Sequence, residues 1–147
     1  MFVQIAIGSV LLLITIAVAG LSFWAMEITV VRMRGWFLRP PHRPKLMLML
    51  SVSAVWVLVQ MTIGVWLWAF TFLMLDVFHT LEMAVYFSLV AYTTLGFGDV
   101  LLPQEWRLLS GMAAVNGLLN IGLVTAFLVE GLRQVRLSQI AETEGAK

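Results

Sequence analysis

The chain has no cysteine, and only 12% of its 147 residues carry a charge. Without cysteine there can be no disulfide, no thiolate nucleophile and no cysteine-based metal site. The two histidines, His42 and His79, fall in different segments and do not suggest a metal site. No spacing of serine, histidine and carboxylate residues indicates a nucleophile–base pair. We therefore expect a protein that is not an enzyme and needs no cofactor.

Apolar residues are abundant instead, at 61% of the chain, and the net charge is only +1. A soluble domain of this length could not bury so much apolar surface in one core. The composition therefore predicts a lipid bilayer as the partner, and no nucleic acid. The apolar run that starts at Phe2 continues to about Met26 with no basic residue before it. Because this run is too long for a typical signal peptide, it predicts a retained membrane helix.

Three stretches are long enough to cross a bilayer as helices, which takes about 20 apolar residues each. A shorter apolar segment, Thr80 to Tyr92, cannot span and fits a re-entrant helix, with Thr80 as its N-cap and Glu82 in its first turn. We therefore predict an all-α membrane protein with three transmembrane helices and one re-entrant helix per chain. The spanning stretches are approximately Phe2–Val31, Leu46–Leu75 and Arg107–Glu130.

The positions of the basic residues and prolines indicate how the chain is divided into segments. Basic residues gather in the proline-rich connection 32–45, and short basic loops stay in the cytoplasm. This rule places the N-terminus outside and the C-terminus in the cytoplasm of a multi-pass protein of the cell (inner) membrane. The predicted divisions are an N-terminal helix, a basic loop, a central module and a short polar tail that could continue the last helix. Their ranges are 1–31, 32–45, 46–130 and 131–147.

Two groups of side chains near the predicted membrane boundaries carry further expectations. Amphipathic rings prefer the interface, so Trp66, Trp68 and Trp106 are expected to face lipid near its outer side. Arg32 and Arg34 lie together at one helix end, whereas a voltage sensor needs a ladder of arginines along a helix. We therefore predict no voltage sensor.

The segment that directly follows the short helix is Thr93-Thr94-Leu95-Gly96-Phe97-Gly98-Asp99. Its two glycines alternate with bulky residues, and glycine adopts left-handed backbone angles that other residues avoid. Such alternation lets successive carbonyl groups point the same way. Rings of carbonyl oxygens contributed by several chains can replace the water around a cation.

Residues 92–99 resemble the selectivity-filter signature of potassium channels, whose common form is Thr-Val-Gly-Tyr-Gly-Asp. The resemblance extends over 46–130 as outer helix, pore helix, filter and inner helix, and residues 122–126 are also similar to the inner-helix pattern of simple bacterial members. It implies passive conduction of K⁺. With one filter segment per chain, a closed ring implies a homotetramer.

The same resemblance assigns roles to individual residues. It implies K⁺ binding by the carbonyl oxygens of Thr94, Leu95, Gly96 and Phe97 and by the Thr94 hydroxyl, with Gly98 completing the ion-binding segment. It also implies that Thr93, Asp99 and Tyr86 support the filter and its outer mouth. Tyr86 could donate a hydrogen bond to Asp99. Tyr86 and Phe87 replace a tryptophan pair found in many relatives, and Val90 replaces a glutamate found in some. The implied cavity and gating residues are Gly117, Leu118, Ile121 and Thr125.

Several alternatives stay open. Gly117 is either a gating hinge or a site of close packing against the short helix. Asn116 and Asn120 share one helix face, and we favour helix packing over cavity lining for them. The first helix has no counterpart in the pore module, and we expect it on the periphery. At the level of function, the alternatives are a non-selective monovalent cation channel and a non-conducting membrane subunit that retains a pore-like loop.

Overall fold

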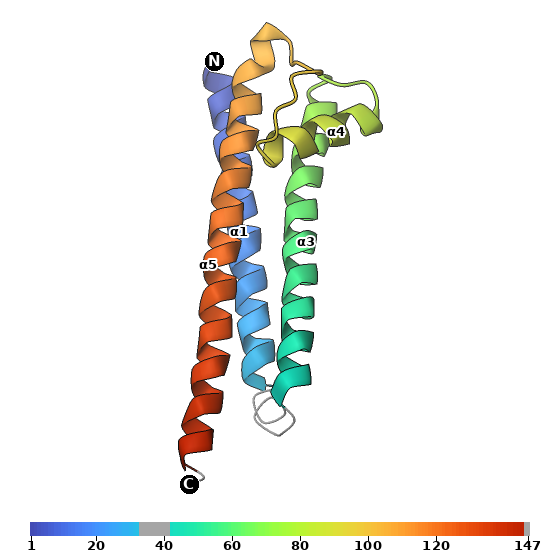
Figure 1. The fold of residues 1–147 in the computed structure, drawn as a ribbon. Helices are drawn as coiled ribbons and strands as arrows, with labels where there is room; N and C mark the ends of the chain where they lie inside the picture. The colour runs from blue at the N-terminus through green and yellow to red at the C-terminus, as the bar shows by residue number, and fades with distance from the viewer. Residues whose placement is uncertain (33–41, 146–147) are drawn as a thin grey trace.

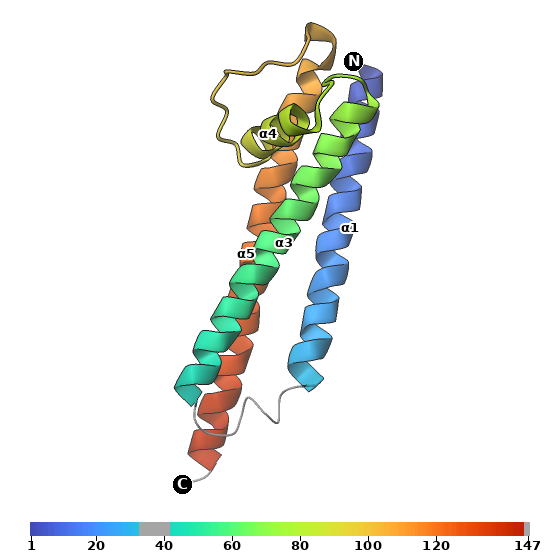
Figure 2. The same cartoon turned by 90° about the vertical axis from the view of Figure 1, so that its right-hand side faces the viewer.

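The computed structural model describes residues 1–32 and 42–145, and over these ranges it contains helices and no strand (Figure 1). Three long helices run side by side. The short helix α4 lies beside the end of the bundle that holds the N-terminus (Figures 1 and 2). In chain order the elements are α1 (Phe2–Arg32), α3 (His42–Met74), α4 (Leu81–Tyr92), the 3₁₀ turn η1 (Gln104–Trp106) and α5 (Arg107–Gly145).

All three long helices are long and apolar enough to cross a membrane. The spans are Phe2–Arg32, Met47–Met74 and Gln104–Gln134, each longer than the roughly 20 residues a bilayer requires. The sequence prediction of three spanning helices and one short apolar helix is confirmed.

Two predicted boundaries differ from the structure. Helix α3 begins at His42, so Pro44 lies inside its first turn rather than before it. Proline is tolerated there because the first-turn N–H groups have no partner within the helix. Helix α5 runs to Gly145, beyond the predicted end of the spanning stretch at Glu130, so the predicted continuation of the last helix is confirmed for 131–145. Most of the predicted basic loop, including Arg34, lies outside the described residues.

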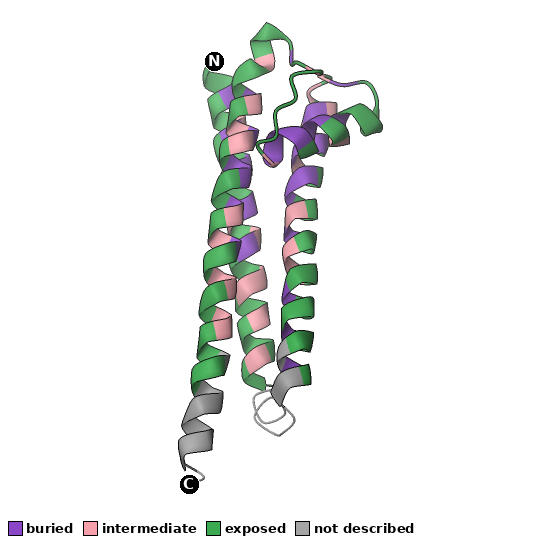
Figure 3. Cartoon of the chain, viewed as in Figure 1, coloured by how far each residue is buried: buried purple, intermediate pink, exposed green. Residues whose placement is uncertain are grey.

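The helices pack in pairs. Helix α1 contacts mainly α5, whereas α4 packs on α3 and α5. In Figure 2, α1 and α3 lie close at the end that carries the N-terminus and diverge toward the other end. Burial follows this pattern, because the buried residues gather around α4 and the adjoining ends of α3 and α5 (Figure 3). Most of the remaining helix surface is exposed, as expected where lipid is the solvent.

Aromatic side chains form the centre of this core. Phe72 meets Phe78 and Phe87 edge-on, with ring centroids 6.0 and 5.4 Å apart. Trp68 is fully buried beside Phe72, so the prediction that its ring faces lipid is wrong. Trp66 is partly exposed, as predicted. The helix period explains the difference, because two residues along a helix turn the side chain to the opposite face.

Candidate functional site

Both ends of helix α4 are capped by identifiable residues. Thr80 has extended backbone angles, and its side-chain oxygen accepts a hydrogen bond from the Met83 N–H at 3.4 Å. Glu82 lies in the first turn, where a negative charge is favourable. Thr93 closes the helix, and its hydroxyl donates to the carbonyl of Leu89 at 2.7 Å. The predicted N-cap and first-turn carboxylate are confirmed.

The backbone after α4 alternates between two conformations. Thr94, Gly96 and Gly98 have positive φ values of 60°, 59° and 76°, whereas the residues between them do not. An alternating backbone turns successive peptide planes so that their carbonyl groups can share one side of the chain. Thr94 is not a glycine, and a residue with a side chain costs about 1–3 kcal/mol in such a conformation. Strain of this kind occurs mainly at functional sites.

The amide groups of this segment are held by the end of α4. The N–H of Thr94 donates to the carbonyl of Ala91 at 2.9 Å, and the N–H groups of Leu95 and Gly96 donate to the carbonyl of Val90 at 3.0 and 3.3 Å. Within the described residues, no donor reaches the carbonyl oxygens of 94–98. The segment therefore presents unpaired carbonyl acceptors and anchors the N–H groups of its first three residues to α4.

In the single chain, all side chains of 94–99 are exposed. Leu95 and Phe97 are 57% and 66% exposed, although both are large and apolar. Because unpaired carbonyls and exposed apolar rings are both unfavourable at membrane depth, the segment requires partners beyond its own chain.

A side-chain hydrogen bond ties the far end of the segment to α4. The Tyr86 hydroxyl donates to Asp99 Oδ2 at 2.5 Å, and Asp99 Oδ1 accepts the Val100 N–H at 3.0 Å. The expected contact between Tyr86 and Asp99 is present. This hydrogen bond raises the pKa of Tyr86, and burial and the negative charge of Asp99 raise it further. Phe87 points elsewhere, since its ring packs in the aromatic core.

Tyr92 fixes the last turn of α4 between the two neighbouring helices. Its ring is buried against Gly64 of α3, where an added Cβ would approach the ring carbon Cε2 to 2.9 Å. Its carbonyl oxygen packs against Gly117 of α5, which leaves no room for a side chain there. Of the two roles predicted for Gly117, close packing against α4 is observed. The hinge stays a prediction.

The other predicted cavity residues do not form one cluster in the single chain. Leu118 is 62% exposed on the surface of α5. Ile121 and Thr125 both line a small cavity of about 40 Å³ between α3 and α5, beside Tyr92. Their place along an ion pathway stays a prediction, because such a pathway would be formed by several chains.

A buried polar cluster joins α1 to α5. Thr15 donates to Asn116 Oδ1 at 2.7 Å, and Asn120 Nδ2 donates to the same oxygen at 2.7 Å. All three side chains are buried. The predicted packing between helices is observed for both asparagines, and Asn120 also lines the small cavity beside Tyr92. Thr15 was not foreseen as their partner, although it is a polar residue in a long apolar run and such residues usually face protein.

Within the described residues, no three histidine or acidic side chains are grouped so that they could hold a metal ion. The candidate site is therefore the backbone segment itself, supported by α4 and contacted by α5. Three apolar spanning helices and a short helix that ends in a row of unpaired carbonyls define an all-helical membrane protein.

Comparison with known proteins identifies the family. The model of an ion channel family matches residues 54–134, which is more than half of the chain and includes most of α3, all of α4 and the described candidate segment. The chain therefore belongs to this ion channel family. Comparison with curated proteins and with solved structures gives no match.

Proposed function

We propose that this ion channel conducts K⁺ selectively through a filter formed by residues 94–98 of four identical chains. The observation that carries the proposal is the alternation of positive φ at Thr94, Gly96 and Gly98, combined with the hydrogen bonds that the N–H groups of residues 94–96 donate to α4. This geometry leaves carbonyl oxygens as the groups available to an ion. Stacked rings of carbonyls can replace the hydration shell of K⁺.

A homotetramer is proposed because a single chain cannot complete the ion site by itself. The carbonyl oxygens of one chain cannot surround an ion. In a closed cyclic assembly, identical chains supply carbonyl oxygens on the other sides by using the same surface of each chain. The neighbouring chains would also cover the exposed rings of Leu95 and Phe97. In this arrangement the C-terminus of α4 points its partial negative charge toward the ion pathway, which favours a cation.

The remaining site residues take supporting roles. The Thr94 hydroxyl completes the innermost ion site, and Thr93 and the Tyr86–Asp99 hydrogen bond hold the two ends of the segment. Leu118, Ile121 and Thr125 line the pathway below the filter. The N-terminus lies outside the cell (inner) membrane and the basic connection lies in the cytoplasm, because basic loops are retained there.

Two measurements test the proposal. Protein reconstituted into liposomes should release K⁺ down its gradient, exclude Na⁺ and be blocked by Ba²⁺. Equal K⁺ and Na⁺ fluxes would support a non-selective cation channel instead. The mass of the protein in mild detergent should be that of four chains, and a monomer without flux would support a non-conducting subunit.

A further inference from the structure

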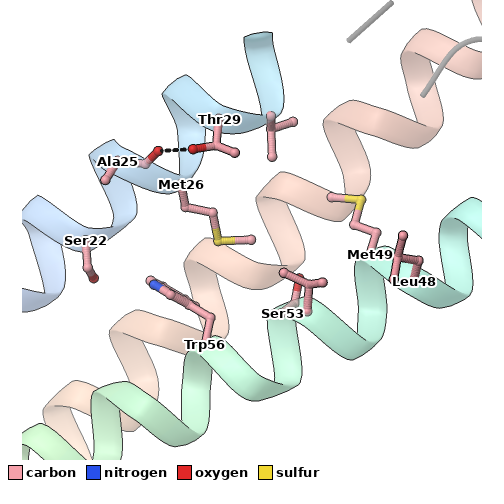
Figure 4. A pocket seen from close by; sticks show the side chains of 10 residues that line it. Ser22, Ala25, Met26, Thr29, Leu48, Met49, Ser53 and Trp56 are labelled. Atoms are coloured by element: carbon pink, nitrogen blue, oxygen red, sulfur yellow. Dashed lines mark hydrogen bonds between the residues drawn. The ribbon is translucent and has the colours of Figure 1, made fainter. Parts of the chain in front are cut away.

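A cavity of about 450 Å³ lies between α1 and α3, in the part of the bundle where these helices diverge (Figure 4). Met26 points into it from α1, and Met49 and Trp56 point into it from α3. All its lining residues belong to the spanning segments Phe2–Arg32 and Met47–Met74. Its size is within the roughly 300–1,000 Å³ of typical ligand sites.

Few polar groups on the lining are free to form hydrogen bonds with water. The Ser22 hydroxyl donates to a carbonyl in the preceding turn and accepts from Gln60, and the Thr29 hydroxyl donates to a carbonyl one turn earlier. Ser53 carries the one buried lining oxygen without a hydrogen-bond partner among the described residues, and it is 1% exposed. The Trp56 indole N–H also lies on the lining, and apart from these groups the wall is apolar. The cavity is open along one side, where Leu48 and Val52 are 51% and 56% exposed, so a chain-shaped apolar group could enter it from the bilayer.

Positive charge lies at the wide end of the cavity. Arg32 is exposed in the last turn of α1, two residues beyond Val30. Basic residues at a membrane boundary attract lipid phosphates. The acidic side chain nearest along α1 is Glu27, which lines a neighbouring cavity toward α5 rather than this one.

We propose that this cavity binds one acyl chain of a phospholipid whose phosphate lies at the Arg32 end. The lining runs from Ser22 to Val30 along α1, which is about 12 Å at 1.5 Å per residue. This depth is close to one leaflet of a hydrocarbon core roughly 30 Å thick. A phospholipid matches the largely apolar wall, the depth and the positive end together. The bound chain fills the gap between α1 and α3 where these two helices do not pack on each other.

The test counts lipid retained by the full-length protein. Protein from vesicles of dioleoyl phosphatidylglycerol is solubilised, washed in mild detergent and examined by native mass spectrometry. We expect one retained lipid for each chain. Ala25→Phe fills the cavity from α1 and should abolish this retention, whereas Ala17→Phe makes the same change at an exposed position of α1 outside the cavity and should not.

A second pair probes the opposite wall and separates lipid loss from misfolding. Val52 lines the cavity and Val55 does not, and they are 56% and 59% exposed. Val52→Phe should abolish lipid retention and Val55→Phe should preserve it, with unchanged helical circular dichroism in both. Equal retention in Ala25→Phe, Val52→Phe and their controls would overturn the proposal, as would wild-type protein that retains no lipid.

A third variant tests the charged end. Arg32→Gln should weaken retention while leaving the cavity wall intact, because the phosphate loses its positive partner. Unchanged retention in Arg32→Gln would contradict the assigned position of the phosphate. These counts are made for each chain and do not require ion flux, so their outcome is independent of K⁺ selectivity.

Discussion

The carbonyl group of Tyr92 packs directly against Gly117, so the end of α4 touches the backbone of α5. An added Cβ at Gly117 would approach the carbonyl carbon of Tyr92 to 2.6 Å, which is too close for any side chain. Tyr92 itself is 1% exposed and held by α3 on its other side. The start of the candidate filter is therefore positioned by two spanning helices at once.

Gly117→Ala should force α4 and α5 apart. Overpacking of this kind typically costs about 1–3 kcal/mol, and here the obstructing group is backbone that cannot rotate away. We expect a lower thermal unfolding midpoint in detergent and a loss of K⁺ flux.

Gly122→Ala is the matched control, since an added Cβ there meets nothing within 4 Å and alanine favours a helix by about 0.5–1 kcal/mol. Equal midpoints for the two variants would contradict the close contact.

Asn116→Ala should loosen the attachment of α1 to α5. The variant removes the side-chain oxygen that accepts hydrogen bonds from both Thr15 and Asn120. Each donor keeps another acceptor, because the Thr15 hydroxyl also reaches the Leu12 carbonyl and the Asn120 amide also reaches the Thr15 hydroxyl. The expected cost is therefore that of lost hydrogen bonds between membrane helices, which average about 0.6 kcal/mol each. A double-mutant cycle with Thr15→Val should give a measurable coupling energy. Additive effects would show that the cluster does not join the two helices.

Tyr86→Phe should weaken the hold on the far end of the candidate filter while leaving the fold intact. The ring stays in place, but the hydrogen bond to Asp99 is lost. We expect K⁺ flux to decay faster during sustained conduction, and tryptophan emission to remain unchanged. Persistent flux equal to that of the wild type would contradict a supporting role for this hydrogen bond.

The same contact predicts a dependence on alkaline pH. The pKa of Tyr86 is raised because its protonated hydroxyl donates to Asp99. A raised pKa means that the stabilisation is fully present below the ordinary tyrosine pKa of about 10 and is lost as the pH rises through the raised value. Flux should therefore stay constant through neutral pH and show an alkaline loss that Tyr86→Phe lacks. The same alkaline loss in both proteins would assign it to another group.

Trp68→Phe should cost little compared with Trp68→Ala. The indole N–H of Trp68 is buried with no hydrogen-bond partner among the described residues, so phenylalanine removes no polar interaction. Truncation to alanine empties part of the aromatic core and typically costs about 3–5 kcal/mol. Unfolding midpoints of the two variants should differ clearly. Similar losses in both would indicate that the N–H does have a partner.

Much of the architecture could be predicted because lipid imposes long apolar runs. Residues 2–31 and 107–130 were predicted as spanning helices, and Thr80 was predicted to cap the short helix. The Tyr86–Asp99 hydrogen bond could also be expected, because the resemblance to potassium channels assigns both residues to support of the filter.

Other features depend on packing between distant segments, which periodicity does not encode. Nearly every face of α1 is apolar, so the sequence did not indicate that its Thr15 side faces α5. The buried position of Trp68 was likewise decided by neighbours far away in sequence. Close packing was one of two roles predicted for Gly117, and the contact with Tyr92 selects it. The positive φ of Thr94 has no local signal, because a threonine does not favour it.

The most direct test of K⁺ selectivity is the reversal potential of the reconstituted protein in a planar bilayer with K⁺ on one side and Na⁺ on the other. Carbonyl rings at residues 94–98 predict a reversal potential shifted strongly toward the K⁺ equilibrium potential, with the current lost in Gly96→Ala because alanine disfavours the φ of +59° at that position. A reversal potential near zero, with equal currents for the two ions, would contradict the account.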